Sequence, residues 1–232
     1  MQILSLPKTD LQISEIGLGT SHFGTHTDRE KAFRIMDRWA EAGGTLIDTL
    51  EECVREGKIR YYGCSNWTAE RMKQAAEYAE AHGAAGFVCN QLAAPVARML
   101  PQFLSTSDMT YLGGDILAYH EESHLPAMSA MSLCNGYFHK QFAGTKIPFF
   151  QNVVYNLPEN ELILQKLKQM QENSVPLGAS LIRFILSWSF PKCALIGFSS
   201  VEQLNALLAD YVTPIPPEDL EELHRLRGDL GA

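Results

Sequence analysis

Positive charge, long apolar runs and paired cysteines are all scarce in this sequence of 232 residues, and each scarcity excludes a class of protein. No apolar run approaches the roughly 20 residues that a membrane-spanning helix needs, and the N-terminus has no charged-then-apolar signal pattern. The 19 lysines and arginines are outnumbered by 27 aspartates and glutamates, so the net charge is −8. We therefore expect a cytoplasmic protein with no nucleic-acid or membrane partner.

Cysteine contributes five residues, and none of them forms the C-x-x-C pair that is typical of metal and redox sites. An odd number of cysteines cannot all be paired within one chain. Four of the five lie in, or within two residues of, segments with strand character, and reduced thiols are the usual state in a cytoplasm. We interpret them as buried structural thiols: Cys53, Cys64, Cys89, Cys134 and Cys193.

The composition is that of an ordinary globular domain, with 46% hydrophobic and 20% charged residues. Short apolar runs alternate with stretches of helical periodicity, and Thr68 is an expected helix N-cap. Strands are predicted at 16–20, 45–48, 59–64, 86–90, 127–132 and 194–198. Helices are predicted at 28–42, 50–56, 68–82, 159–173, 177–190, 201–208 and 217–226.

Repeated strand–helix units predict a parallel sheet, because a parallel connection needs a crossover helix. Glycines and polar residues cluster where the predicted strands end, which is where a βα-barrel binds its ligands. One interval is short: strands begin at residues 16 and 45, and the next begins at 59, only 14 residues later. A crossover usually needs a dozen or more residues, so the spacing indicates that a segment is missing there.

Motifs that occur in order along the chain resemble those of the aldo-keto reductase family. The most specific is G-K-I-R-Y-Y-G-C-S-N at residues 57–66. The others lie at 16–24, 42–49, 90–91, 131–136 and 196–204. The resemblance runs from about residue 11 to the C-terminus, and it implies an eight-stranded βα-barrel that binds NADP(H) at its C-terminal face.

Against the family pattern, the chain has the first two strands and then continues at the end of the fourth helix and the fifth strand. Strands three and four would lie between Thr49 and Leu50 and are absent. The resemblance therefore implies an α/β fold, a truncated TIM-type (βα) barrel with about six parallel strands instead of eight. We expect residues 1–232 to form a single domain of this kind, with the deletion junction near 49–50.

The family reduces carbonyl groups with a hydride from NADPH, and a tyrosine protonates the developing alkoxide beside a lysine, a carboxylate and usually a histidine. The resemblance places the carboxylate at Asp48, but residues 50–54 contain no tyrosine. The lysine and histidine belong to the missing strands. Tyr61 or Tyr62 could point into the barrel, yet neither lies at a strand's C-terminal end, so Asp48 is the one retained tetrad member.

More of the cofactor-binding positions are retained. By resemblance, Ser65, Asn66 and Gln91 hydrogen-bond the nicotinamide carboxamide, while Met131 stands where a tyrosine would stack on the ring. The segment after the last strand meets a helix N-terminus suited to an anion, but the family's usual cation for the 2′-phosphate is not visible there. Binding of NADP(H) is therefore expected to be weak or lost. The implied cofactor residues are Ser65, Asn66, Gln91, Met131, Ser132, Gly197, Ser199, Ser200 and Gln203.

A competing motif, H-E-x-x-H, occupies residues 120–124. On one face of a helix it would place two zinc ligands beside a glutamate base, as in a zinc hydrolase. Leu125 and Pro126 follow at once, and no third ligand is evident. We interpret this segment as a solvated helix end and predict no metal site.

Three functions remain open from the sequence. The first is a catalytically impaired aldo-keto reductase homologue that retains a ligand site, with a small carbonyl compound as the possible ligand. The second is an active NADP(H)-dependent oxidoreductase that uses non-standard residues or a site completed by oligomerisation. The third is a non-catalytic interaction or scaffold protein. We also expect a homo-oligomer, joined through the open edge between the predicted strands at 45–48 and 59–64.

Overall fold

The computed structural model describes residues 2–7, 10, 12–19, 29–43, 63–81, 87–107 and 109–229. The predicted strand at 45–48, the predicted helix at 50–56 and the junction between Thr49 and Leu50 lie outside these residues. Most of the predicted strand at 59–64 also lies outside them.

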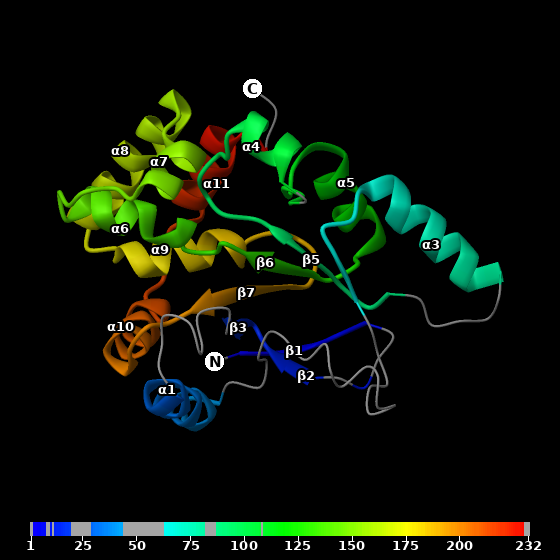
Figure 1. Cartoon of the computed structure of the whole chain (residues 1–232), viewed down its shortest axis with the longest axis horizontal. Helices are drawn as coiled ribbons and strands as arrows, with labels where there is room; N and C mark the ends of the chain where they lie inside the picture. The colour runs from blue at the N-terminus through cyan, green and yellow to red at the C-terminus, as the bar shows by residue number, and fades with distance from the viewer. Residues whose placement is uncertain are drawn as a thin grey trace.

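Five parallel strands form the central sheet (Figure 1). They are β3 (Ile16–Gly19), β4 (Cys64–Ser65), β5 (Asn90–Ala93), β6 (Ala127–Ala130) and β7 (Lys192–Gly197). Their order is β3-β7-β6-β5-β4, so the first of these strands in the sequence pairs with the last. That neighbourhood of first and last strands is typical of a βα-barrel. The predicted fold class, a truncated (βα) barrel, is confirmed.

The strand register places the C-terminal ends of all five strands along one edge of the sheet. Gly19 at the end of β3 pairs with Gly197 at the end of β7. Ser65 at the end of β4 pairs with Gln91 in β5, and Ala93 at the end of β5 pairs with Ala130 in β6. The side chains and loops that follow these strands therefore share one face of the barrel.

A hairpin that the sequence reasoning did not predict precedes the sheet. Its strands, β1 (Ile3–Ser5) and β2 (Gln12–Ser14), pair antiparallel. Their apolar residues pack against β7 and cover the end of the sheet at which the parallel strands begin. A small cavity between the hairpin and these strand starts is lined by Leu4, Leu6, Ile13, Cys89, Pro126, Ala127, Met128, Lys192 and Cys193.

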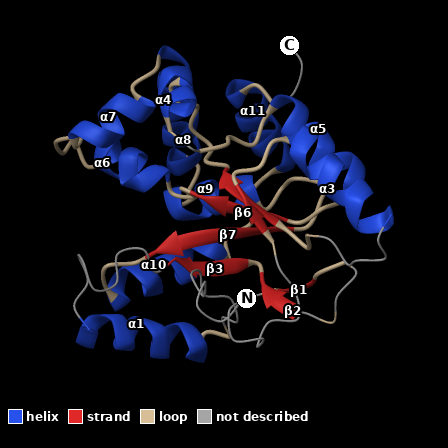
Figure 2. Cartoon of the chain, turned by 45° about the vertical axis from the view of Figure 1, so that its right-hand side comes forward, coloured by secondary structure: helices blue, strands red, loops and turns tan. Residues whose placement is uncertain are grey.

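Helices cover the outside of the sheet, and Figure 2 shows α1 and α10 beside β3 and β7. Contacts run from α1 to α10, from α10 to α9, and from α9 to α8 and α11. The described helices are α1 (Arg29–Glu41), α3 (Ala69–Ala81), α4 (Pro101–Thr106), α5 (Gly114–Ser123), α6 (Tyr137–Phe142), α7 (Phe149–Tyr155), α8 (Pro158–Glu172), α9 (Leu177–Ile185), α10 (Val201–Tyr211), α11 (Pro217–Arg227) and the short 3₁₀ helix η1 (Cys134–Gly136).

Local chemistry explains where several helices begin and end. Thr68 caps α3 as predicted, because its Oγ1 accepts a hydrogen bond from the Arg71 backbone N–H at 3.3 Å. Proline stands in the first turn of α4, α8 and α11, where its missing N–H has no cost. Gly228 ends α11 with a φ of 92°, a left-handed conformation that glycine adopts without strain.

Several predicted boundaries are wrong, and three of the errors have a local cause. The strand predicted at 86–90 begins at Asn90, the first residue that pairs with both neighbouring strands. The strand predicted at 127–132 stops at Ala130, because Met131 turns into the left-handed region with a φ of 58°. The helix predicted at 177–190 ends at Ile185, after which the Ser187 hydroxyl donates to the Phe184 carbonyl at 2.6 Å.

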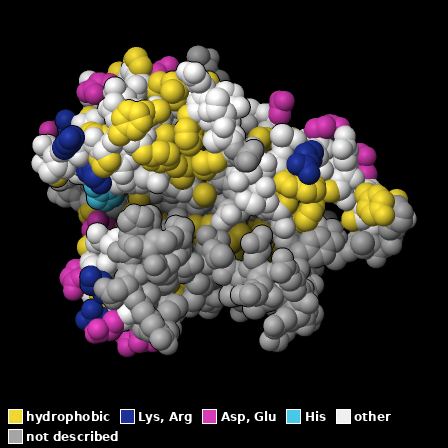
Figure 3. All heavy atoms as spheres, in the orientation of Figure 1, with side chains coloured by type: hydrophobic (Ala, Val, Ile, Leu, Met, Phe, Trp, Pro, Cys, Tyr) yellow, Lys and Arg dark blue, Asp and Glu magenta, His cyan; other side chains and the backbone are white. Residues whose placement is uncertain are grey.

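The main apolar core lies between the sheet and these helices. Ile35 and Trp39 of α1 are buried in it, as the predicted helix periodicity requires. The longest described helix, α8, has 15 residues, and none of the described helices has the length and apolar character needed to cross a membrane. Large apolar side chains also gather on the surface over α7 (Figure 3), where Phe149 is 85% exposed.

Candidate functional site

The structure brings together the three residues predicted to hold a carboxamide. Ser65 ends β4, Asn66 follows it with a φ of 59°, and Gln91 lies beside them in β5. The Ser65 hydroxyl lies 3.2 Å from Gln91 Oε1, and Asn66 Nδ2 lies 3.3 Å from Ser65 Oγ. The Asn66 backbone N–H also donates to the Gln91 carbonyl at 2.7 Å. Two side-chain amides and one hydroxyl therefore lie at the C-terminal edge in a defined arrangement.

Thr110 orients this amide, and the sequence reasoning missed it. Its backbone N–H donates to Asn66 Oδ1 at 3.1 Å, and its hydroxyl donates to the Asn66 carbonyl at 2.8 Å. Because a backbone N–H can only donate, the atom that faces it must be the amide oxygen. The Asn66 NH₂ group therefore points away from Thr110. The chain offers no motif around Thr110 that would have indicated this contact.

Met131 and Ser132 follow β6 on the same edge. Met131 is half-buried and has left-handed backbone geometry. Ser132 is buried, and its hydroxyl donates to the Ser129 carbonyl at 2.7 Å. That bond directs the Ser132 side chain into the protein. The thioether of Met131 has no aromatic face on which a planar ring could stack, so this position supplies apolar contact alone.

The predicted anion-binding segment follows β7 and opens α10. Gly197 ends the strand and is exposed. Ser200 is the N-cap, with its Oγ accepting from the Gln203 N–H at 3.3 Å. The Ser199 N–H in turn donates to Gln203 Oε1 at 2.9 Å. Side chains of the helix itself therefore already take two of the backbone donors that could face a phosphate.

Glu202 adds a negative charge at the same helix end. Hydrogen bonds from its own backbone N–H and from Ser200 hold the pKa of this carboxyl below its ordinary value, and the charge of Arg34 contributes in the same direction. A carboxylate that is stabilised at a helix N-terminus competes with any phosphate for that position. Electrostatically, the segment is thus a poor match for a dianionic group.

Two cations from α1 lie beside α10, and the sequence reasoning did not foresee them. Arg38 Nε donates to Asn205 Oδ1 at 2.8 Å, and Arg34 is close enough to influence Glu202. Both come from a helix far away in the sequence. Only the packing of α1 against α10 reveals them.

The predicted catalytic residue, Asp48, lies outside the described residues, as do Tyr61 and Tyr62. Tyr111 is the described tyrosine next to Thr110, and its hydroxyl donates to the Ala97 carbonyl at 3.3 Å. Burial raises the pKa of Tyr111 to about 12, which makes it a poor proton donor at neutral pH. Tyr111 is therefore a poor candidate for the acid that the family resemblance implies.

Four of the five cysteines are described, and all four are free thiols. Cys64, Cys134 and Cys193 are buried, as predicted, while Cys89 is half-buried. Burial raises the pKa of Cys64 to about 12 and that of Cys89 to about 11, so both stay protonated and unreactive at neutral pH.

The H-E-x-x-H segment does not lie along one helix face. Helix α5 ends at Ser123, and His124 has left-handed geometry with an exposed side chain. His120 is buried against Phe190, and its Nδ1 lies 2.7 Å from the Leu125 carbonyl. Among the described residues, no group of three or more histidine, cysteine or acidic side chains is arranged to hold a metal ion.

Comparison with known proteins identifies relatives of this chain. Norsolorinic acid reductase stcV of Emericella nidulans is 38% identical over 72 residues, which cover 28% of this chain and 18% of that protein. The uncharacterized oxidoreductase YrpG of Bacillus subtilis is 43% identical over 49 residues, covering 21% of this chain and 15% of that protein. Each aligned segment thus spans less than a fifth of the relative's length.

The family model for aldo/keto reductases matches residues 48–227, well over half of the chain. The match agrees with the strand order of the sheet and with the serine–asparagine pair at the end of β4. This chain belongs to the aldo/keto reductase family.

Proposed function

We propose that this chain retains the part of an NADP(H) site that holds the nicotinamide carboxamide, binds the cofactor weakly, and does not reduce carbonyl compounds at the rate of a complete reductase. The observation that carries the proposal is the hydrogen-bonded arrangement of Ser65, Asn66 and Gln91 at the C-terminal strand edge. A small carbonyl compound is the class of ligand that would accompany the cofactor.

The carboxamide part of the site fits its ligand. Thr110 holds Asn66 Oδ1, so the Asn66 NH₂ group faces outward, with one proton directed at Ser65 Oγ. Its second proton has no acceptor among the residues that the structure describes, and it can donate to a carboxamide oxygen. A bound nicotinamide would supply a hydride; the role of these side chains is to orient it.

The phosphate part of the site fits poorly. Gln203 and Ser200 satisfy backbone donors at the start of α10, and the Glu202 carboxylate repels an incoming phosphate. Arg34 and Arg38 supply positive charge nearby, but Arg38 already bonds Asn205. We therefore expect a dissociation constant for NADP(H) in the high micromolar range or weaker.

Proton donation to the substrate is the second function in which this chain falls short of a complete reductase. Asp48 is the retained tetrad residue by resemblance, and the family's tyrosine, lysine and histidine have no counterpart in the sequence. A positioned general acid typically contributes a factor of about 10²–10⁴ to the rate. Weak cofactor binding and the missing acid together favour an impaired enzyme over an active one.

Fluorescence titration with NADPH tests the binding part of the proposal. Asn66→Asp keeps the oxygen that Thr110 needs but removes the NH₂ donor, so we expect it to weaken binding by about tenfold or more. Asn152→Asp makes the same change at an exposed position on α7 and should leave binding unchanged. Sub-micromolar binding by the unmodified chain would contradict the expected weak affinity, and equal affinity in all three proteins would contradict the carboxamide site.

Turnover of NADPH with a generic aromatic aldehyde tests the catalytic part. We expect no appreciable oxidation of NADPH above the uncatalysed rate. Turnover within the usual enzyme range of roughly 1–10³ per second would show that another residue supplies the proton. Tyr62→Phe would then be the first variant to examine.

A further inference from the structure

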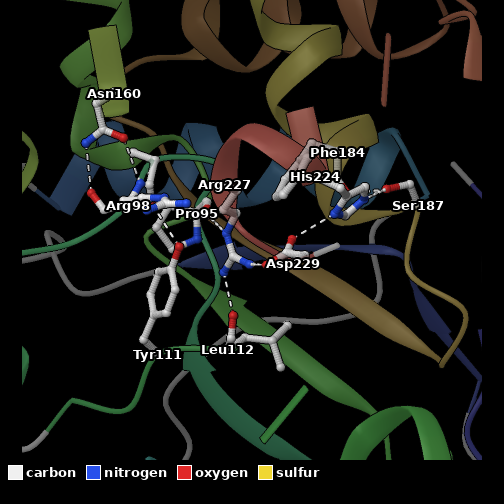
Figure 4. Close-up of polar contacts among 11 residues, drawn as sticks. Pro95, Arg98, Tyr111, Leu112, Asn160, Phe184, Ser187, His224, Arg227 and Asp229 are labelled. Carbon is white, nitrogen blue, oxygen red and sulfur yellow. Dashed lines mark hydrogen bonds and ion pairs between the residues drawn. The ribbon is translucent and has the colours of Figure 1, made fainter. Parts of the chain in front are cut away.

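A serine, a histidine and an aspartate form a continuous hydrogen-bonded series between the segment after α9 and the end of α11 (Figure 4). Ser187 Oγ lies 2.6 Å from His224 Nε2, and His224 Nδ1 lies 2.8 Å from Asp229 Oδ2. Ser187 follows α9 and precedes the first residue of β7, whereas His224 belongs to α11. No residue of the proposed cofactor site takes part.

A carboxylate that orients a histidine must itself be fixed, and Asp229 is held in place. Its second oxygen is bonded by Arg227 Nη1. The same guanidinium donates through Nε to the Pro95 carbonyl at 2.8 Å and through Nη2 to the Leu112 carbonyl at 2.6 Å. Arg227 is 3% exposed and is thereby fixed on three sides. The carboxylate it binds cannot swing away from His224.

The carboxylate also determines which ring nitrogen carries a proton. A carboxylate only accepts, so Nδ1 of His224 donates to Asp229, and the neutral ring presents Nε2 as a base toward Ser187. The imidazole packs against two rings that also contact each other: its centroid is 4.3 Å from that of Phe184 and 5.6 Å from that of Trp188. This is the division of roles in a Ser-His-Asp triad.

Exposure increases along the series toward the serine. The Asp229 side chain is 4% exposed and that of His224 is 11% exposed, while Ser187 is an exposed residue. The Ser187 hydroxyl has a second acceptor, the Phe184 carbonyl at 2.6 Å. Because a hydroxyl proton rotates about the Cβ–Oγ bond, it can face either acceptor. The nucleophile is thus the accessible member, and its base lies within reach.

The residue after the nucleophile offers a donor for an oxyanion. The backbone N–H of Trp188 makes no hydrogen bond with any residue that the structure describes. A backbone N–H directly after a nucleophilic serine is a common member of oxyanion holes in acyl-transfer enzymes. The rings of Phe184 and Trp188 are buried against His224, so an acyl group would approach the exposed serine from the solvent side.

We propose that Ser187, His224 and Asp229 form an acyl-transfer centre that hydrolyses short-chain carboxylic esters. Ser187 Oγ forms a bond to the acyl carbon, its proton passes to His224 Nε2, and the bond to the leaving alcohol breaks as His224 returns that proton to the departing oxygen. Water then attacks the acyl-serine, gives a proton to His224, and releases the acid as Ser187 regains it. Ester and water become acid and alcohol, with no oxidation or reduction.

The test uses a fluorophosphonate probe, which reacts covalently with activated serines, on the full chain, with the modified residue located by mass spectrometry. We expect labelling at Ser187 and hydrolysis of p-nitrophenyl acetate. Ser187→Ala should abolish both, and Asp229→Asn should slow labelling by about 10²-fold or more. Ser189→Ala, at an exposed neighbour, should change neither. Circular dichroism of each variant separates loss of activity from loss of fold.

Other results of the same experiment would contradict the proposed acyl-transfer centre. If Ser187 in the unmodified, folded chain is not labelled, or is labelled no faster than Ser189, the centre does not exist. The same holds if folded Ser187→Ala hydrolyses the ester as fast as the unmodified chain. The series would then be a structural link between α9 and α11. None of these results depends on NADP(H), so they leave the proposed cofactor site untouched.

Discussion

At the start of α10, single side chains decide what the helix end can bind. The Glu202 carboxylate is hydrogen-bonded to its own backbone N–H, and Gln203 bonds the Ser199 N–H. These contacts satisfy donors that a phosphate would otherwise use. Neither side chain is part of the core, since both are exposed. Changes at this position should therefore alter ligand affinity while stability stays nearly constant.

Glu202→Gln should strengthen NADPH binding by about two- to five-fold at low salt, because it removes a negative charge from the helix end that would receive the phosphate. Fluorescence titration measures the change. Glu80→Gln, at an exposed position on α3, removes the same charge far from α10 and serves as the control. Equal gains in the two variants would mean that net charge alone is responsible.

His120 gives a prediction about pH. Burial lowers its pKa below the ordinary value of about 6.5. As pH falls below about 6.5, the unfolded chain takes up a proton that the folded chain resists, so the free energy of unfolding decreases. Urea unfolding at pH 7.5 and pH 5.5 should show a smaller difference in His120→Gln than in the unmodified chain. His124→Gln, at an exposed histidine, should keep the full difference; identical pH dependence in all three would exclude His120 as the source.

At the scale of elements, the pairing of β4 with β5 positions the candidate carboxamide site. The Cys64 N–H donates to the Cys89 carbonyl at 2.9 Å, one residue before Ser65. Gly63 comes immediately before this contact. A Cβ atom at Gly63 would lie 2.9 Å from the Cys89 carbonyl oxygen and 2.5 Å from its Sγ, closer than real Cβ contacts come. The strand pair therefore has no room for a side chain there.

Gly63→Ala should lower the free energy of unfolding by about 1–3 kcal/mol, because β4 must shift away from β5 to accommodate the methyl group. Chemical denaturation measures this loss, and weaker NADPH binding should accompany it. Gly113→Ala is the matched control, since its Cβ would be in ordinary contact at 3.4 Å with the Tyr111 ring. A Gly63→Ala protein as stable as the control would contradict the close approach.

At the scale of the whole molecule, the described sheet has two edge strands, β3 and β4. Among the described residues, β4 pairs with β5 alone and β3 pairs with β7 alone. Unpaired strand edges and apolar surface favour association between chains. The sequence predicts a homo-oligomer joined through the gap between the predicted strands at 45–48 and 59–64, and that gap lies outside the described residues.

Size-exclusion chromatography with light scattering should therefore give a mass of at least twice 25.9 kDa at high micromolar concentration. Dilution should shift the mass downward if the association is reversible. A strict monomer across the whole concentration range would reject the oligomer. It would favour a sheet that closes on itself with fewer strands.

Much of the fold was determined by local sequence pattern. Alternating apolar runs and capped amphipathic stretches predicted the parallel strands and most of the helices, because periodicity and capping act within a few residues. The glycine-rich and S-N motifs predicted the family, the truncated barrel and the membership of Ser65, Asn66 and Gln91 in one cluster. These features needed no knowledge of distant contacts.

Tertiary structure decided the rest, since it brings together groups that are far apart in the chain. Thr110 meets Asn66 across 44 residues, and Arg38 meets Asn205 across 167. The Ser187–His224 contact spans 37 residues, and no spacing pattern in the sequence predicts it. Side-chain hydrogen bonds of this kind depend on the relative placement of whole elements, and helix and strand periodicity does not encode that placement. The sequence thus determines the family and the elements, while packing determines which side chains can act together.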